Sequence, residues 1–322
     1  MATDIPRAIS RSAPERNNQF VISTHSPVFV TPDTVNNIIR VHRTPNSGSA
    51  KVALQDIDLP ARKSLVRMIN SQNNERVFFA DKAVLVEGIT DRLVLASLLD
   101  GACARFANNQ AIEIIEVGGK NNFDDYRSLL VALMTPPYVL ADLDYLTIVG
   151  SKSIRALFVP NAESQWNALK SKKSTDATTM VAELKRAIDT SDVLQLEQFW
   201  RYLVGRHQRL RDPLTEQERQ ALVAELERLR SENVLVLRHG EIENYLPSGI
   251  SSVKEIVELT TDRNWINRIP DETRRLELGQ LVCHILDVPK EQRDQLEEEL
   301  RQQRVAFPQP VSERADLSGH TT

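Results

Sequence analysis

The chain has 322 residues, of which 41% are hydrophobic and 26% charged, with a formal net charge of −4 at pH 7. This composition is typical of a globular protein with one large or two ordinary domains, and the acidic balance excludes a protein that holds nucleic acid mainly by bulk positive charge. No apolar run could span a bilayer and residues 1–12 lack a signal-peptide core, so we expect a cytoplasmic protein without a membrane partner.

The first eighty residues contain few regular elements. Residues 1–18 are polar and indicate a flexible lead-in. Residues 19–24 and 38–43 are short apolar runs that predict strands, the second followed by a turn. Residues 60–80 have helical spacing of their apolar positions.

A regular alternation begins after residue 80. Residues 83–86, 112–117 and 138–141 are predicted strands, and residues 90–99 and 123–134 are predicted helices between them. Strand and helix alternating at this spacing predict a parallel sheet with crossover helices, and therefore an α/β fold.

The rest of the chain is mainly helical. Residues 161–231 are charged and helix-periodic, and we interpret them as an insertion before a last strand at residues 234–237. Residues 251–303 are predicted to be helical again. Residues 304–322 are polar with prolines and are expected to be disordered.

Pairs of acidic residues follow three of the predicted strands. They are Glu87 with Asp91, Asp142 with Asp144, and Glu241 with Glu243. Parallel strands present their carboxyl ends at one sheet edge, and carboxylate oxygens are the ligands that hard cations such as Mg²⁺ or Mn²⁺ prefer. Two such ions roughly 3.5–4 Å apart can activate a water and stabilise the leaving oxygen of a phosphodiester.

A simpler interpretation has to be weighed for these acids. An acidic residue after a strand is often only a helix N-cap, and for Asp91 alone this explanation is as good as a metal site. A cap accounts for one of Asp142 and Asp144 but not for both. Zinc is not indicated, because Cys103 and Cys283 lie far apart without CxxC spacing and no His/Cys cluster accompanies the acids.

Two of these motifs carry a family resemblance. Val-Leu-Val-Glu-Gly-x-x-Asp (84–91) and Ala-Asp-Leu-Asp (141–144) resemble the Toprim domain of topoisomerases, primases and OLD (overcoming lysogenization defect) nucleases. The resemblance is closer to OLD endonucleases, many of which have a helical insertion before the last Toprim strand, and Glu-Ile-Glu-Asn-Tyr-Leu (241–246) is similar to their late motif. It covers roughly residues 17–250, with residues 81–160 and 232–250 as the Toprim domain.

The resemblance implies a metal-dependent DNA endonuclease with two Mg²⁺ or Mn²⁺ ions. The residues it assigns to metal binding are Glu87, Asp91, Asp142 and Asp144, completed by Glu241 or Glu243. Arg238 and His239 stand where the family usually has a lysine, which implies a cation for transition-state charge. Gly119 and Lys120 would lie near a DNA phosphate, although a glycine turn followed by a solvated lysine is more common than a phosphate site.

The N-terminal region carries a second resemblance. Phe-Val-Ile-Ser-Thr-His-Ser-Pro (20–27), with His25, is similar to the switch-histidine strand that closes the ABC-type ATPase domain of this family. The chain has no G-x-x-x-x-G-K-[ST] phosphate loop, so we expect no ATP site in it. Residues 1–80 are therefore expected to be the end of, and linker from, an ATPase domain of a longer parent protein.

Several alternatives stay open at this stage. The Toprim site could be vestigial, in a module that binds nucleic acid or docks a partner ATPase. A topoisomerase would need a tyrosine nucleophile in a separate cleavage domain, and neither Tyr126 nor Tyr245 has such a domain around it. Helices of the insertion or after residue 250 could also form a homodimer interface.

Overall fold

The structure is a computed structural model that describes residues 21–31, 34, 37–44, 48–54, 74–160, 182, 184–186, 188–194, 196, 208–250 and 252–308. The chain divides into two compact units. The first unit is Met1–Leu140 with Tyr245–Thr322, and the second unit is Ala141–Asn244. Among the described residues, no helix has the length and apolar character needed to cross a membrane.

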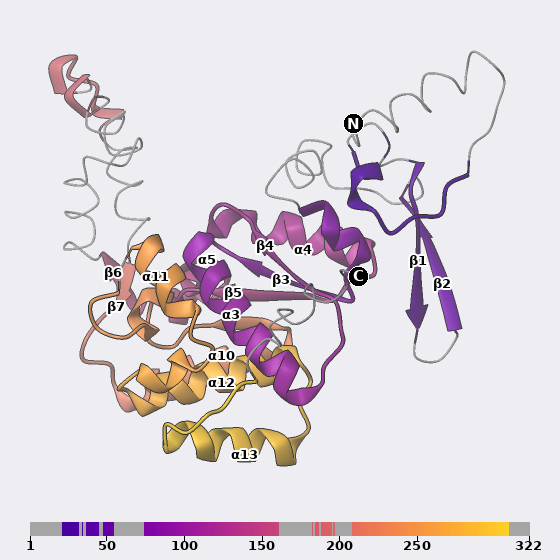
Figure 1. The fold of residues 1–322 in the computed structure, drawn as a ribbon. Helices are drawn as coiled ribbons and strands as arrows, with labels where there is room; N and C mark the ends of the chain where they lie inside the picture. The colour runs from indigo at the N-terminus through magenta and orange to yellow at the C-terminus, as the bar shows by residue number, and fades with distance from the viewer. Residues whose placement is uncertain are drawn as a thin grey trace, which may run out of the picture. The chain divides into compact units, whose positions relative to one another are not determined.

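A four-stranded sheet has the strand order β4-β3-β5-β8, and Figure 1 labels β3, β4 and β5 of it. Its strands are β3 (Lys82–Val86), β4 (Ile112–Glu116), β5 (Pro137–Ala141) and β8 (Val234–Val236). β3 pairs in parallel with both β4 and β5. All five residues of β3 are buried, as expected for a parallel strand covered on both faces. The predicted α/β class with a parallel sheet is confirmed.

Two helices connect the first three strands. α3 (Ile89–Phe106) follows β3, and α4 (Phe123–Ala132) follows β4. α3 buries an apolar stripe that includes Val94, Leu95, Leu98, Leu99 and Ala102. It continues past the predicted end at residue 99 and stops at Ala107, whose φ of +49° is the left-handed cap conformation.

The N-terminal part of the first unit contains an antiparallel hairpin. β1 (Ile39–Thr44) pairs with β2 (Gly48–Ala53), in agreement with the strand predicted at 38–43. Residues 21–26 have no regular secondary structure and precede a 3-10 turn, η1 (Pro27–Phe29), which differs from the strand predicted at 19–24. A strand needs a neighbour for its backbone groups, and none of the described strands pairs with this segment.

A buried arginine attaches this hairpin to the rest of the first unit. Arg40 in β1 is 8% exposed, and its Nε donates to Phe78 O at 3.0 Å. Its Nη2 donates to Ala80 O at 2.7 Å and its Nη1 to Leu133 O. Phe78 lies in η4 (Asn74–Phe79), which leads into β3, and Leu133 follows α4. Burial lowers the pKa of Arg40 and nearby Asp81 opposes this, but a guanidinium stays protonated at neutral pH.

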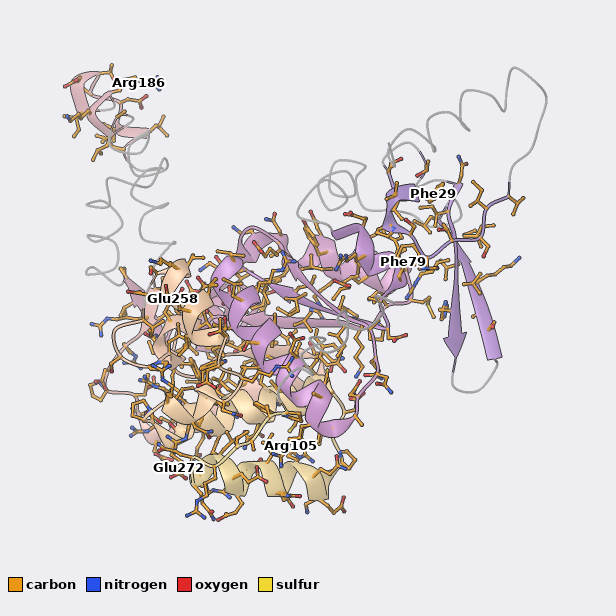
Figure 2. The ribbon with its side chains drawn as sticks, in the orientation of Figure 1. Phe29, Phe79, Arg105, Arg186, Glu258 and Glu272 are labelled. Atoms are coloured by element: carbon orange, nitrogen blue, oxygen red, sulfur yellow. The ribbon has the colours of Figure 1, made fainter. Side chains whose placement is uncertain are left out.

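The C-terminal part of the first unit is helical, as predicted for residues 251–303. Its elements are α11 (Val253–Thr260), η8 (Trp265–Arg268), α12 (Glu272–Ile285) and α13 (Lys290–Arg301). α11 and α12 pack against α3. Arg105 of α3 binds both carboxylate oxygens of Glu299 in α13, at 2.7 and 2.8 Å, which lowers the pKa of Glu299 (Figure 2 labels Arg105). Cys103 and Cys283 are both free thiols.

The start of the expected disordered tail is packed. Val305 O accepts a hydrogen bond from Asn267 Nδ2 at 2.8 Å, and Phe307 N donates to Asn264 Oδ1 at 2.8 Å. The Phe307 ring covers Gly101 so closely that a Cβ there would lie 2.7 Å from Phe307 Cγ. The expectation of a loose tail therefore does not hold for residues 304–308, because two apolar side chains and two asparagine amides anchor them. Residues 309–322 lie outside the described residues.

The second unit contains the parts of the predicted insertion that the structure describes. β6 (Phe158–Pro160) pairs antiparallel with β7 (Gln208–Leu210), a strand that the helical prediction for 161–231 does not contain. α10 (Glu216–Ser231) begins with a capping box between Thr215 and Glu218 and packs against β8. Two short helices, α5 (Leu146–Val149) and α6 (Lys152–Arg155), lie before β6.

The contact between Gly101 and Phe307 gives a stability prediction. In an ordinary helix interior, Gly→Ala stabilises by about 0.5–1 kcal/mol. Here Gly101→Ala should destabilise the chain by about 1–3 kcal/mol, because the new methyl group overpacks against the ring. In a Phe307→Ala background the same substitution should become neutral or stabilising. Urea unfolding of the four chains checks this, and equal effects in both backgrounds would disprove the contact.

Arg40 gives a second prediction. Arg40→Met should destabilise the chain by on the order of 3 kcal/mol, because the carbonyls of Phe78, Ala80 and Leu133 lose their donor. Arg40→Lys should recover only part of this loss, since an ammonium cannot reach three carbonyls in the planar arrangement of a guanidinium. Hydrogen exchange of β1 and β2 measures the effect. Unchanged protection of the hairpin in Arg40→Met would show that Arg40 does not hold it.

Candidate active site

The turn between β3 and α3 holds the first pair of predicted ligands. Glu87 directly follows β3, and Gly88 is the N-cap of α3. Asp91 is 8% exposed, and its Oδ2 accepts a hydrogen bond from Gly88 N at 2.9 Å. Asp91 is therefore not the N-cap that the simpler interpretation proposed, but the third helical residue, whose side chain caps the backbone N–H of Gly88. A carboxylate has two oxygens and several lone pairs, so this cap is compatible with a second role as a ligand.

The turn after β4 lies beside Glu87. Gly118 N donates to Glu87 O at 3.2 Å, which extends the parallel pairing of β3 and β4 beyond their ends. Gly118 and Gly119 have φ values of +69° and +122°, a region that favours glycine. Asn122 Nδ2 donates to Val117 O at 2.8 Å and holds the turn, which continues into η5 (Lys120–Asn122). The structure thus brings the predicted phosphate-binding turn, Gly119 and Lys120, next to Glu87.

An ion pair at this corner was missed by the sequence analysis. Arg92 Nη1 lies 3.2 Å from Glu116 Oε1, and the Glu116 side chain is only 10% exposed. Glu116 is the last residue of β4 and pairs in register with Val86, the residue before Glu87. The signal was present, since Arg92 follows Asp91 directly and Glu116 is an acid at a strand end. It was not recognised because the pairing depends on the register of β3 and β4.

The second pair of predicted ligands lies in the second unit. Asp142 is the N-cap of η6 (Leu143–Tyr145), and its carbonyl accepts from Tyr145 N at 3.0 Å. Asp144 lies within η6, and its carbonyl accepts from Thr147 Oγ1 at 2.7 Å. The two acids therefore belong to one compact turn, whose backbone is fixed by its own hydrogen bonds.

The third pair of acids lies in a neighbouring turn of the same unit, which we call the late turn (residues 238–244). It carries Arg238, His239, Glu241 and Glu243. Leu237 N donates to Ala141 O at 2.9 Å, and Leu143 N donates to Gly240 O at 3.1 Å. The second bond joins the late turn directly to the turn of Asp142 and Asp144. η7 (Ile242–Tyr245) ends the late turn, and its Ile242 and Tyr245 are buried.

The donor set can be compared with the expected cation. All six predicted ligands are carboxylates, which fits Mg²⁺ or Mn²⁺ and does not fit a soft metal. Within the part of the chain that the structure describes, no three or more His, Cys, Asp or Glu side chains are grouped so that they could hold a metal ion. Glu87 and Asp91 belong to the first unit, and the other four acids belong to the second.

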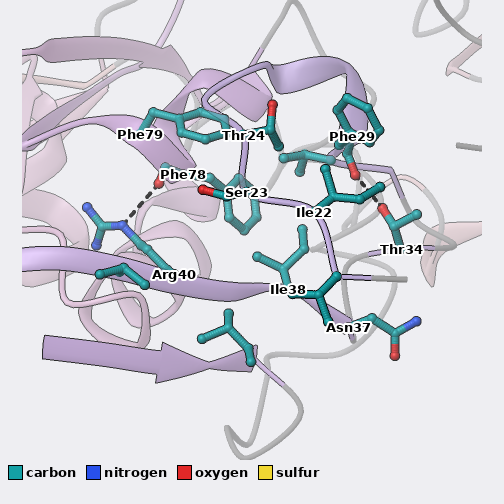
Figure 3. Close-up of a pocket in the computed structure, with 14 residues that line it drawn as sticks. Ile22, Ser23, Thr24, Phe29, Thr34, Asn37, Ile38, Arg40, Phe78 and Phe79 are labelled. Carbon is teal, nitrogen blue, oxygen red and sulfur yellow. Dashed lines mark hydrogen bonds between the residues drawn. The ribbon is translucent and has the colours of Figure 1, made fainter. Parts of the chain in front are cut away.

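A wide cavity lies elsewhere in the first unit. It has a volume of about 620 Å³ and is formed by residues 21–24, η1, β1 and η4 (Figure 3). Its described lining residues are mostly apolar, with Phe29, Phe78 and Phe79 among them, and none of those described residues is a carboxylate. Phe78 and Phe79 precede β3, whereas Glu87 follows it, so the cavity and the turn of Glu87 and Asp91 adjoin opposite ends of this strand. The exposed His25 of the ATPase-like motif is not among the lining residues.

Comparison with known proteins identifies part of the chain. Residues 78–144 match the family described as overcoming lysogenization defect protein-like, TOPRIM domain. The Old nuclease of Escherichia phage P2 is 23% identical over 210 residues, which cover 62% of this chain and 36% of that protein. The chain thus matches well under two thirds of this relative. The matched domain contains Glu87, Asp91, Asp142 and Asp144. The family match and the parallel sheet together support an OLD-like Toprim domain at residues 78–144.

Proposed function

We propose that this chain is a divalent-metal-dependent DNA endonuclease. The observation that carries the proposal is that both acidic motifs of the OLD-like Toprim domain fall on turns that directly follow strands β3 and β5. The similarity to a protein named as a nuclease supports the same class of reaction. The substrate is then a DNA phosphodiester, with water as the attacking group.

We assign metal binding to Glu87, Asp91, Asp142 and Asp144, with Glu241 or Glu243 completing a second position. Two bound Mg²⁺ or Mn²⁺ ions would supply an activated water and offset the charge on the leaving oxygen. Support comes from the local geometry of each turn. The Asp91 carboxylate is held by Gly88 N, and Asp142 and Asp144 share one hydrogen-bonded turn. The Asp91 carboxylate would therefore lose little freedom on binding a cation, and the backbone that carries Asp142 and Asp144 is already ordered.

The remaining predicted residues act on the phosphate. Lys120 lies in the turn beside Glu87, where a cation would attract and orient the DNA backbone. Arg238 and His239 lie in the late turn, next to the turn of Asp142 and Asp144, and would offset the charge of the transition state. Arg92 is paired with Glu116, so it balances a carboxylate of the protein and is not assigned to DNA.

We further propose that the nuclease works with an ABC-type ATPase domain. The support is the ATPase-like motif at residues 20–27, which carries His25. In the first unit, Arg40 joins the hairpin that follows this motif to the chain segment entering β3. Residues 21–54 would then connect the ATPase to the sheet. The compartment would be the cytoplasm, and association of two copies through the helical parts is compatible with this arrangement.

Loss of a predicted ligand should abolish cleavage. With Mn²⁺ or Mg²⁺ the chain should nick supercoiled plasmid, and Glu87→Gln and Asp142→Asn should each lower the rate by at least on the order of 100-fold. That is above the roughly 10–100-fold cost of losing an outer partner of a metal ligand. Glu258→Gln is the matched control, because its carboxylate lies on α11 with 66% of its side chain exposed. Wild-type cleavage by both site variants would refute the assignment.

A vestigial Toprim module is the rival function, and metal binding separates the two. Calorimetric titration with Mn²⁺ should give a binding signal for the wild-type chain that is lost in a Glu87→Gln/Asp142→Asn double variant. A vestigial module would retain DNA binding in a gel-shift assay, yet would give neither a Mn²⁺ signal nor nicking. That combination of results would replace the nuclease with a docking or DNA-binding role.

A further inference from the structure

We propose that Asn244 is a positioning residue of the nuclease site, which holds the late turn in place beside the turn of Asp142 and Asp144. The inference rests on the proposed function and assigns a role to a side chain that is neither a predicted ligand nor a predicted cation. The hydrogen bonds that carry it lie within the second unit, whose last residue is Asn244.

A backbone hydrogen bond joins the late turn to the turn of Asp142 and Asp144. Leu143, which stands between Asp142 and Asp144 in sequence, donates its backbone N–H to Gly240 O at 3.1 Å. This bond lies beyond the backbone bond of Leu237 with Ala141 and joins the backbones of the two turns. The orientation of the Gly240 carbonyl therefore decides where the late turn lies relative to the two aspartates.

Gly240 has a backbone conformation with positive φ. Its φ is +107°, which side-chain-bearing residues rarely adopt. Asn244 Nδ2 donates at 3.0 Å to the carbonyl of His239, the residue before Gly240. Asn244 thus binds the peptide group on one side of Gly240, and Leu143 binds the carbonyl on the other side. A Cβ at Gly240 would lie 2.5 Å from Asn244 Nδ2, so the amide occupies the space that only glycine leaves open.

We call the hydrogen bonds on either side of Gly240, from Asn244 to His239 O and from Leu143 to Gly240 O, the clamp. The clamp is connected to Glu241 and Glu243 through η7. Asn244 belongs to η7, whose Ile242 and Tyr245 are 2% and 0% exposed and anchor it in the core. Asn244 N also donates to Glu241 O at 3.0 Å. Glu241 and Glu243 therefore lie on a short segment between the clamp at His239 and the buried anchors. Loss of the Asn244 amide would free this segment while leaving every carboxylate and every cation in place.

The consequence is a change in metal dependence. Outer partners of metal ligands typically account for roughly 10–100-fold in metal affinity or activity, because they hold ligands in the bound geometry. Without the clamp, the late turn has more conformations to lose when a cation binds. We therefore expect the Mn²⁺ concentration for half-maximal cleavage to rise, with cleavage partly recovered at saturating Mn²⁺.

The experiment compares Asn244→Ala and Asn244→Asp with wild type. Asn244→Asp keeps the shape of the side chain but replaces the amide donor by an acceptor facing the His239 carbonyl. Both variants should raise the half-maximal Mn²⁺ concentration in plasmid nicking by about 10–100-fold. Asn267→Ala is the matched control, since Asn267 Nδ2 also donates to a backbone carbonyl, Val305 O at 2.8 Å, in the C-terminal helical part. It should leave the Mn²⁺ dependence unchanged.

A second measurement reports on the clamp without any catalysis. Hydrogen exchange at the Leu143 amide should become faster in both Asn244 variants and stay unchanged in Asn267→Ala. Unchanged exchange at Leu143 would overturn the clamp. Faster exchange with an unchanged Mn²⁺ dependence would overturn its role in the site and leave a purely structural residue. If the wild-type chain neither bound Mn²⁺ nor cut DNA, the proposed nuclease function would fail, and the exchange data would still report on the clamp separately.

Discussion

The parallel pairing of β3 with both β4 and β5 is the constraint on which the other features depend. Parallel strands finish at the same sheet edge, so the residues that follow β3 and β4 must meet there. The bond from Gly118 N to Glu87 O is the direct result, and so is the pairing of Arg92 with Glu116. A register shift of one residue would turn Glu116 to the other face of the sheet and remove that ion pair.

The acidic turns are held by backbone groups and caps, and this has a chemical consequence. Asp91 binds Gly88 N, the turn of Asp142 and Asp144 binds Gly240 O, and Asn244 binds His239 O. A neutral backbone partner orients the Asp91 carboxylate without adding another charge. In the proposed site, bound divalent cations would offset the repulsion between neighbouring carboxylates.

The apolar cavity of the first unit adjoins the end of β3 opposite to Glu87. Phe29, Phe78 and Phe79 are among the described residues that line it, and none of those lining residues is acidic. Through Arg40, the hairpin beside this cavity is attached to the segment that enters β3, which gives the proposed ATPase region a physical connection to the sheet.

By itself the sequence determined the α/β class, the strands that precede the acids and the Toprim motifs, because apolar runs, helical periods and motif spacing are local properties. It also raised an N-cap role for Asp91, whereas in the structure Gly88 is the N-cap and the Asp91 side chain binds its backbone N–H from the first helical turn. Only the tertiary structure decided that Arg92 pairs with Glu116, that Phe307 packs on Gly101, and that Leu143 bonds to Gly240. Those contacts join residues far apart in the chain, or depend on strand register and backbone conformation, and a pattern of neighbouring side chains does not specify them.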